Sequence, residues 1–293
     1  MTRKHTPQLT LLLGPAGCGK TETLIEAFQQ ALKNSQDLLA DDLLFILPTA
    51  EHRARAVDLV LRKGLQGFFH RRITTFDRAL GELLKLGGID FATDQTRRII
   101  LRDILIRQQF SYFGQAAREP GFLELSARIL IELKESLVTP DELKRRLEPL
   151  KSRFPESRLK YEDLERLYEA YERELSARGL VDQRDSLRLL EKGLERGEYS
   201  DPRLSRVWID GFSDFSKLQL SFIEFLTRHA DEVTVTLTLT QDPLRRALFQ
   251  VVSDTEAALE DMGFEKKELG PANYRSSRAG LRHLERTLFR EGK

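Results

Sequence analysis

The sequence is poor in cysteine and contains no long hydrophobic run. Cys18 is the single cysteine among 293 residues, so one chain cannot form a disulfide framework, a zinc site built from cysteines, or a cysteine-held iron–sulfur cluster. No apolar stretch reaches the roughly 18 residues that a membrane span needs, and the charged N-terminus lacks a secretory hydrophobic region. These absences predict a cytoplasmic protein from a reducing compartment, with no membrane partner.

An excess of charge of either sign is also missing. The 47 basic and 46 acidic side chains leave a formal net charge of +1, so there is no global attraction to nucleic acid. Any site for a polyanion must therefore be a local patch. Hydrophobic residues make up 40% of the chain, which is enough for a packed core, and the length suggests one or two domains at roughly 150 residues each.

A glycine-rich segment near the N-terminus has the spacing of a phosphate-binding P-loop. An apolar run over residues 9–13 precedes Gly14, which is followed after four residues by Gly19, Lys20 and Thr21. Such glycines let backbone N–H groups surround phosphate oxygens, while the lysine adds charge and the threonine hydroxyl ligates Mg²⁺. An ordinary glycine turn leaves the Lys-Thr pair unexplained. We therefore predict an ATP and Mg²⁺ site formed by Gly14, Pro15, Ala16, Gly17, Cys18, Gly19, Lys20 and Thr21.

Strand and helix patterns alternate on both sides of a long helical stretch. Residues 43–47 and 71–76 read as strands, each followed by a helical pattern, and strands return at 206–210 and 232–239. Residues 94–196 show helical periodicity without a convincing strand, and Thr139 is placed to cap a helix beginning at Pro140. The chain is thus predicted to be an α/β protein of the P-loop NTPase (RecA-like) class. Its parallel sheet has helices on both faces, and an all-helical insertion divides it into residues 1–92, 93–200 and 201–293.

Asp210 is a candidate Mg²⁺ ligand in the predicted nucleotide site. It ends the apolar segment 207–209, where parallel strands present ligands for Mg²⁺, although an Asp-Gly pair is also common in turns. Helicases of this layout that hydrolyse ATP carry a water-orienting glutamate immediately after this aspartate. Here the position is Gly211, and glycine has no side chain to orient water. We therefore assign no catalytic residue and expect nucleotide binding with weak or no hydrolysis.

Together these segments resemble a known family. The order of residues 14–21, 43–49, 73–76, 207–212 and 233–240 is similar to the N-terminal part of the B subunit of AddAB-type ATP-dependent helicase–nucleases, which are related to UvrD-like superfamily 1 helicases. The most specific feature is the Asp210-Gly211-Phe212 segment with the strand that follows. The resemblance covers nearly the whole chain.

The resemblance implies a first RecA-like domain interrupted by a helical subdomain. It implies binding to DNA, as single strands or duplex ends, and a role in processing double-strand breaks for recombinational repair, where this subunit helps scan for a recombination signal while a helicase–nuclease partner subunit unwinds. Family members continue into a second RecA-like domain and a nuclease domain, neither of which fits within 293 residues and one cysteine. We therefore expect a part of a longer protein or a shortened member, with half of the nucleotide cleft and no nuclease site.

The resemblance also places DNA contacts in the loops after the second and third strands. Hydroxyls and backbone N–H groups there suit phosphates, and Phe76 either stacks on a base or packs in the core. Gln241 is a candidate sensor of the γ-phosphate. The DNA-binding candidates are Thr49, Arg71, Arg72, Thr74, Thr75 and Phe76.

Several alternatives remain open from the sequence. The chain can be an active superfamily 1 ATPase and DNA helicase whose water-orienting acid lies elsewhere. It can be a P-loop small-molecule kinase, although an insertion of this length is large for a lid, or an interaction module with a relic P-loop. The basic runs Arg97-Arg98 and Lys144-Arg145-Arg146 suit either solvated helix faces or contacts to a nucleic-acid backbone.

Overall fold

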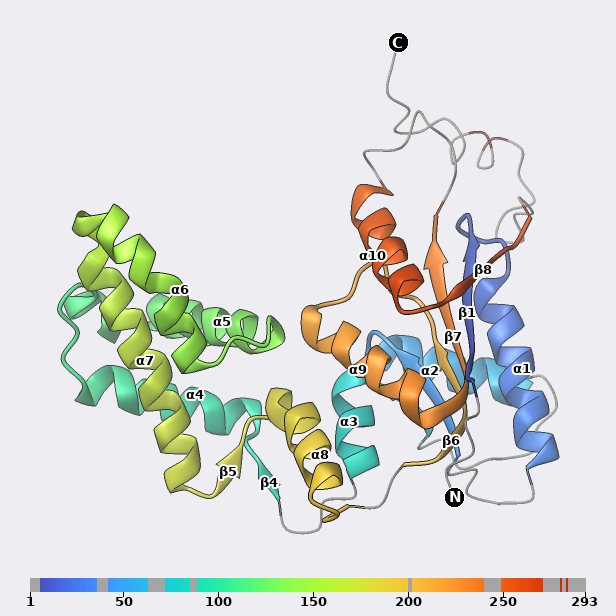
Figure 1. Ribbon diagram of the computed structural model, residues 1–293, viewed down its shortest axis with the longest axis horizontal. Coiled ribbons are helices and arrows are strands. Elements are labelled where there is room, and N and C mark those ends of the chain that lie inside the picture. The colour runs from blue at the N-terminus through green and yellow to red at the C-terminus, as the bar shows by residue number, and fades with distance from the viewer. Residues whose placement is uncertain are drawn as a thin grey trace. The chain divides into compact units, whose positions relative to one another are not determined.

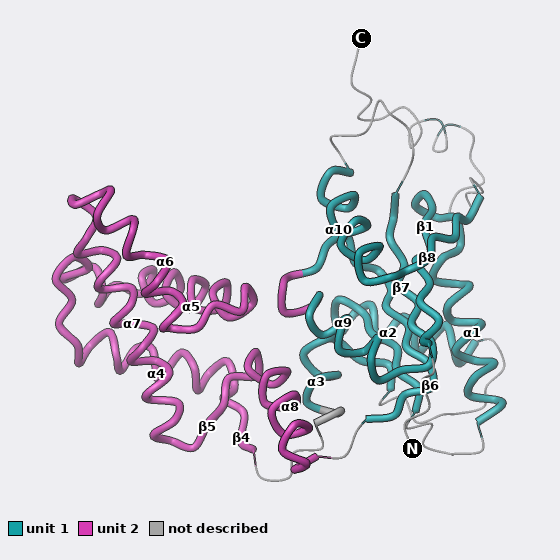
Figure 2. Tube along the Cα trace, in the orientation of Figure 1, with its two compact units in different colours: residues 1–83, 200–215, 220–293 teal, residues 84–199, 216–219 magenta. Residues whose placement is uncertain are grey.

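The structure, a computed structural model, divides into two compact units (Figure 2). The sheet unit comprises residues 1–83, 200–215 and 220–293, and the helical unit comprises residues 84–199 and 216–219. Within them the structure describes residues 6–35, 42–62, 72–84, 89–199, 202–239, 249–270, 280 and 283. In this part of the chain, none of the helices has the length and apolar character needed to cross a bilayer.

The sheet unit is built on six parallel strands in the order β3-β2-β6-β7-β1-β8. One strand, β7, therefore separates the P-loop strand β1 from β6, the strand that leads to Asp210. This arrangement confirms the predicted parallel α/β sheet. The strands are β1 Gln8–Gly14, β2 Leu43–Leu47, β3 Ile73–Thr75, β6 Leu204–Ile209, β7 Ala230–Thr238 and β8 Glu265–Glu268.

Helices cover both faces of this sheet, with α1 on one side and α9 and α10 on the other (Figure 1). An aromatic group fixes α1 against the sheet: Phe28 meets Phe45 and Trp208 edge-to-face, with ring centroids 5.6 and 5.4 Å apart. Because α1 carries the end of the P-loop, this packing also sets the position of the loop. The helices are α1 Lys20–Asn34, α2 Ala50–Arg62, α3 Phe76–Leu84, α9 Lys217–His229 and α10 Gln250–Asp261.

The helical unit has a core of its own, formed mainly by α4, α5, α6 and α7. Ile100 and Leu101 of α4 pack in one cluster with Leu167 and Tyr171 of α7. Thr139 caps α6 as predicted, because its side chain accepts a hydrogen bond from the backbone N–H of Glu142. The helices are α4 Asp94–Arg107, α5 Pro120–Glu135, α6 Pro140–Arg153, α7 Arg158–Ala177 and α8 Ser186–Glu195, with short 3₁₀ turns η2 Gly114–Arg118, η3 Pro155–Ser157 and η4 Gln183–Asp185.

Three short strands were not predicted from the sequence. β4 Asp90–Phe91 and β5 Leu180–Val181 pair in parallel at the base of the helical unit, and two residues are too few to show a period. β8 lies at the edge of the main sheet and consists of four exposed charged residues. An edge strand of this composition has no hydrophobic alternation, and charge on an edge discourages pairing with other chains.

Candidate nucleotide site

The P-loop connects β1 to α1 and needs glycine at three positions. Gly17 and Gly19 have φ angles of 80° and 94°, in the left-handed region that side chains other than glycine rarely adopt. At Gly14 a Cβ atom would lie 2.6 Å from Cys18 Sγ and 3.2 Å from the Leu269 carbonyl oxygen, so a side chain there would have to displace the Cys18 side chain and would crowd Leu269. The local sequence thus imposes the loop conformation that the spacing predicts.

Lys20 is the first residue of α1 and folds back into the loop. Its Nζ donates hydrogen bonds to the carbonyl oxygens of Gly14 and Pro15, at 2.7 and 2.9 Å, and only 8% of the residue is exposed. These carbonyls are neutral, so the ammonium charge is not cancelled by them. A phosphate placed in the loop would supply an anionic acceptor to the same ammonium group.

Asp210 and Thr21 meet in space as the sequence analysis expects, although 189 residues separate them. The Thr21 hydroxyl donates to one carboxylate oxygen of Asp210 at 2.7 Å, and the hydroxyl of Thr236 on β7 donates to the other. Asp210 is 3% exposed, so these bonds hold its carboxylate in one orientation. One hydroxyl and one carboxylate fit the way proteins hold Mg²⁺, which takes its other ligands from phosphates and water.

A cavity of about 400 Å³ opens beside this pair. It extends from the P-loop across the carboxyl ends of β2, β6 and β7 to one face of α2, and it is lined by residues 16–17, 19–22 and 210–213 with Leu47, His52, Arg55, Ala56, Leu59, Thr236 and Thr238. The carboxyl ends of parallel strands are where open α/β sheets bind their ligands. The sequence alone does not predict that Thr236 and the α2 residues line this cavity, because their distance from the P-loop depends on strand register and on the direction of α2.

Gly211 borders the same cavity in a conformation that excludes a larger side chain. Its φ angle is 87°, and a Cβ atom there would lie 3.3 Å from Pro48 Cδ. A glutamate at this position would be strained in its backbone and crowded by Pro48. At position 211, therefore, both the sequence and the local backbone conformation disfavour an acidic side chain.

The candidates for DNA binding divide into exposed and buried groups. Thr49 is exposed and directly precedes α2, where its hydroxyl lies 2.8 Å from His52 Nδ1, and Thr75 is half-buried. Arg72 and Thr74 are buried, and the Thr74 hydroxyl has no hydrogen-bond partner in the described part of the chain. Arg71 and Gln241 lie outside the described residues.

Phe76 packs among other aromatic rings. Its ring meets those of Phe212, Phe215 and Phe222 edge-to-face, with centroids 5.0, 5.8 and 5.9 Å apart, and the residue is 5% exposed. This packing supports the core interpretation of Phe76 over base stacking.

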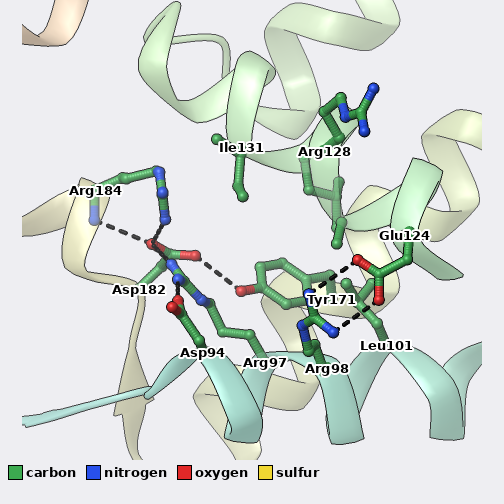
Figure 3. A pocket seen from close by; sticks show the side chains of 12 residues that line it. Asp94, Arg97, Arg98, Leu101, Glu124, Arg128, Ile131, Tyr171, Asp182 and Arg184 are labelled. Carbon is green, nitrogen blue, oxygen red and sulfur yellow. Dashed lines mark hydrogen bonds and ion pairs between the residues drawn. The ribbon is translucent and has the colours of Figure 1, made fainter.

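The helical unit contains a second cavity, of about 320 Å³, in which most charged side chains are paired with one another, whereas Arg128 has no ion pair among the described residues (Figure 3). Arg98 forms an ion pair with Glu124 at 2.7 Å, and Arg97 bridges Asp94 and Asp182. Asp182 also accepts a hydrogen bond from the Tyr171 hydroxyl at 2.8 Å. Arg97 therefore belongs to a buried ion-pair network, whereas Arg98 forms an exposed ion pair.

Burial would raise the pKa of Asp182, but the charges of Lys134 and Arg97, with hydrogen bonds from the Arg184 backbone and Tyr171, hold it below its ordinary value. The carboxylate is thus charged and matched inside the unit. The cavity therefore borders an ion-pair network that stabilises the helical unit.

The fold and the site geometry together define the class: an α/β protein with a RecA-like parallel sheet and a helical insertion. Comparison with known proteins then gives the family. The family model described as "ADDB, N-terminal" matches residues 11–285, and the chain belongs to this family. This confirms the resemblance seen in the sequence.

Curated relatives agree with the family match. The chain is 35% identical to the B subunit of the ATP-dependent helicase/deoxyribonuclease of Desulforudis audaxviator (strain MP104C), over 96% of this chain and 25% of the relative. The protein of the same name from Geobacillus kaustophilus (strain HTA426) is 30% identical over 96% of this chain and 26% of its own length. The chain thus spans about a quarter of the length of these relatives.

Proposed function

We propose that this chain is the ATP- and DNA-binding N-terminal part of a helicase–nuclease subunit that processes double-strand DNA ends in recombinational repair. The family match supports this role, as does the name of the relatives, which are B subunits of an ATP-dependent helicase/deoxyribonuclease. The chain acts together with a partner subunit that carries the motor activity. It supplies nucleotide and DNA contacts, and it contributes no nuclease site.

The contact between Thr21 and Asp210 beside the P-loop is the observation that supports nucleotide binding most directly. The P-loop backbone and Lys20 would hold the phosphates, while Thr21 and Asp210 would hold Mg²⁺, which neutralises phosphate charge when bound. Thr236 positions Asp210 through its hydroxyl. Gly211 leaves no water-orienting acid at the expected place, so we propose that the site binds the nucleotide with weak or no hydrolysis.

Isothermal titration calorimetry with Mg-ATP tests the nucleotide site. We expect saturable binding by the native chain and at least a tenfold loss of affinity in Lys20→Ala, since one charge-assisted phosphate contact is worth about 1.5–3 kcal/mol. Asp210→Asn is expected to reduce the difference between titrations with and without Mg²⁺. Unchanged affinity in Lys20→Ala would show that the P-loop is not the site.

DNA binding is proposed at the loops that follow β2 and β3. Thr49 is exposed at the N-terminal end of α2, where a helix N-terminus favours a phosphate oxygen. Thr75 is partly exposed and directly precedes Phe76. Fluorescence anisotropy with a labelled single strand tests this role. Thr49→Val should weaken binding several-fold while Thr49→Ser, which keeps the hydroxyl, should not. Equal affinities for both variants would exclude Thr49.

A further inference from the structure

One face of α2 turns toward the nucleotide cavity. His52, Arg55, Ala56 and Leu59 line it, at the i, i+3, i+4 and i+7 spacing of a single helix face. The two apolar members form a wall, and Ala56 is buried. The two polar members are an imidazole and a guanidinium, and they share the cavity with Lys20, Glu22 and Asp210.

Arg55 has no counterion in the described part of the chain. Neither an ion pair nor a hydrogen bond holds its guanidinium there, and the nearby carboxylate of Asp58 pairs instead with Arg62 at 2.8 Å. A guanidinium carries several donors in a planar fork that matches the oxygens of a phosphate. An unpaired arginine on an ordinary surface is simply solvated, but this one borders a cavity that already contains a phosphate-binding loop.

His52 stands beside the Asp210-Gly211 corner. Its Nδ1 shares a hydrogen bond with the Thr49 hydroxyl at 2.8 Å, which fixes the ring, and its Cδ2 lies 3.9 Å from the Cβ position of Gly211. The Nε2 edge of the ring adjoins that Cδ2 atom. The imidazole thus occupies the side of the corner toward which a side chain at position 211 would point.

We propose that Arg55 and His52 contact the terminal phosphate of a bound Mg-nucleoside triphosphate, so that this single domain distinguishes a triphosphate from a diphosphate. The inference rests on the proposed nucleotide site. It assigns α2 a binding role in which no bond is made or broken. The P-loop would hold the β-phosphate in either nucleotide. Arg55 and His52 line the same cavity as the P-loop, so they are placed to contact a further phosphate.

Such a site would distinguish a bound triphosphate from a diphosphate with residues of one domain alone. In two-domain motors the second domain supplies arginine contacts to the nucleotide, whereas here a cation on α2 of the same sheet unit would meet it. Because Gly211 carries no water-orienting group, Arg55 would report the presence of the third phosphate without promoting its hydrolysis.

Calorimetric titration with Mg-ATPγS and with Mg-ADP tests the inference. For Arg55→Ala we expect at least a tenfold loss of affinity for the triphosphate and less than a twofold change for the diphosphate, with partial recovery in Arg55→Lys. His52→Ala should lower the affinity for the triphosphate several-fold and leave the affinity for the diphosphate unchanged. Arg62→Ala is the matched control, because Arg62 lies on the same helix, is exposed, and does not line the cavity.

The outcomes separate this inference from the nucleotide site itself. Equal effects of Arg55→Ala on both nucleotides, or no effect on either, would overturn the inference while leaving the P-loop site intact if Lys20→Ala still abolishes binding. No binding of either nucleotide by the native chain would overturn the proposed site, and the inference with it.

Discussion

The two cavities of this chain are both lined by charged side chains, but they differ in how those charges are balanced. In the helical unit Arg97, Arg98 and Asp182 are matched by neighbouring groups of opposite charge. In the nucleotide cavity Lys20 rests on carbonyl oxygens, and Arg55 has no counterion among the described residues. Charges that neutralise each other stabilise a structure, whereas Arg55 borders a cavity that also contains a phosphate-binding loop. Arg128 in the helical unit likewise has no ion pair among the described residues, but its cavity contains no such loop.

Lys134 shows how complete the balance is in the helical unit. Its Nζ lies 2.6 Å from Glu172 and 2.7 Å from Asp185, and the side chain is 3% exposed. Burial would lower the pKa of Lys134, but the carboxylates of Asp185 and Glu172 outweigh it and raise the pKa above its ordinary value. Removing Lys134 would leave the half-buried carboxylate of Glu172 without its ion pair, while Asp185 would keep only Arg188, at 3.5 Å.

The largest effect should therefore follow the removal of that ammonium group. Lys134→Met keeps most of the side-chain volume but leaves the half-buried carboxylate of Glu172 without its ion pair, and it should lower the free energy of unfolding by about 3–5 kcal/mol. Urea unfolding followed by circular dichroism measures this loss. Lys144→Met removes an exposed lysine of the same unit and should change stability by about 0.5 kcal/mol or less. A loss below about 1 kcal/mol for Lys134→Met would remove the distinction between the two regions.

An intermediate effect is expected at Gly211, where the nucleotide cavity depends on backbone conformation. Gly211→Ala forces a side chain into a left-handed conformation at 3.3 Å from Pro48 and should cost about 1–2 kcal/mol of unfolding free energy. Gly121→Ala is the control, since this glycine lies in α5 with nothing within 4 Å of its Cβ position. That variant should be neutral or more stable, and a similar loss in both would contradict the explanation.

A smaller stability effect is expected for the lysine of the P-loop. Lys20→Met removes an ammonium group that donates to two neutral carbonyls and to Cys18 Sγ and that lines an open cavity, so the free energy of unfolding should fall by less than in Lys134→Met, by about 1 kcal/mol. Nucleotide affinity should nevertheless be lost. The pair Lys134→Met and Lys20→Met thus sharpens the comparison, because one should affect mainly stability and the other mainly binding. A loss of stability as large as that of Lys134→Met would place Lys20 among the structural charges.

The smallest effect concerns pH. Burial raises the pKa of Glu172, and the charge of Lys134 only partly opposes this shift. The folded state therefore holds a proton that the unfolded state releases near the ordinary glutamate pKa of about 4.3, so this residue's contribution to stability is present below that pH and is lost as pH rises through the raised pKa.

Glu172→Gln should remove that dependence. The difference in unfolding free energy between the native chain and the variant, measured by urea titrations at several pH values above about 4.3, should become less favourable to the native chain as pH rises. A difference that stays flat, or that changes in the opposite direction, would contradict the raised pKa.

Much of the fold and part of the site were predictable from the sequence, for identifiable reasons. The P-loop spacing and the apolar strand before Asp210 are local patterns, and the rule that parallel strands present ligands at their carboxyl ends brings Thr21 and Asp210 together. Thr236, His52 and Arg55 were not predicted because their approach to the cavity depends on strand register and on the direction of α2. The partner of Arg97, Asp182, is 85 residues away and has no sequence signal.

The central claim is that the P-loop holds a nucleotide without turning it over, and phosphate release tests it most directly. Mg-ATP at saturating concentration is incubated with the native chain and with Lys20→Ala, each with and without excess single-stranded DNA. We predict saturable binding by the native chain and the same background rate of phosphate release in all four reactions. DNA-stimulated release by the native chain that disappears in Lys20→Ala would contradict the account and identify an active motor.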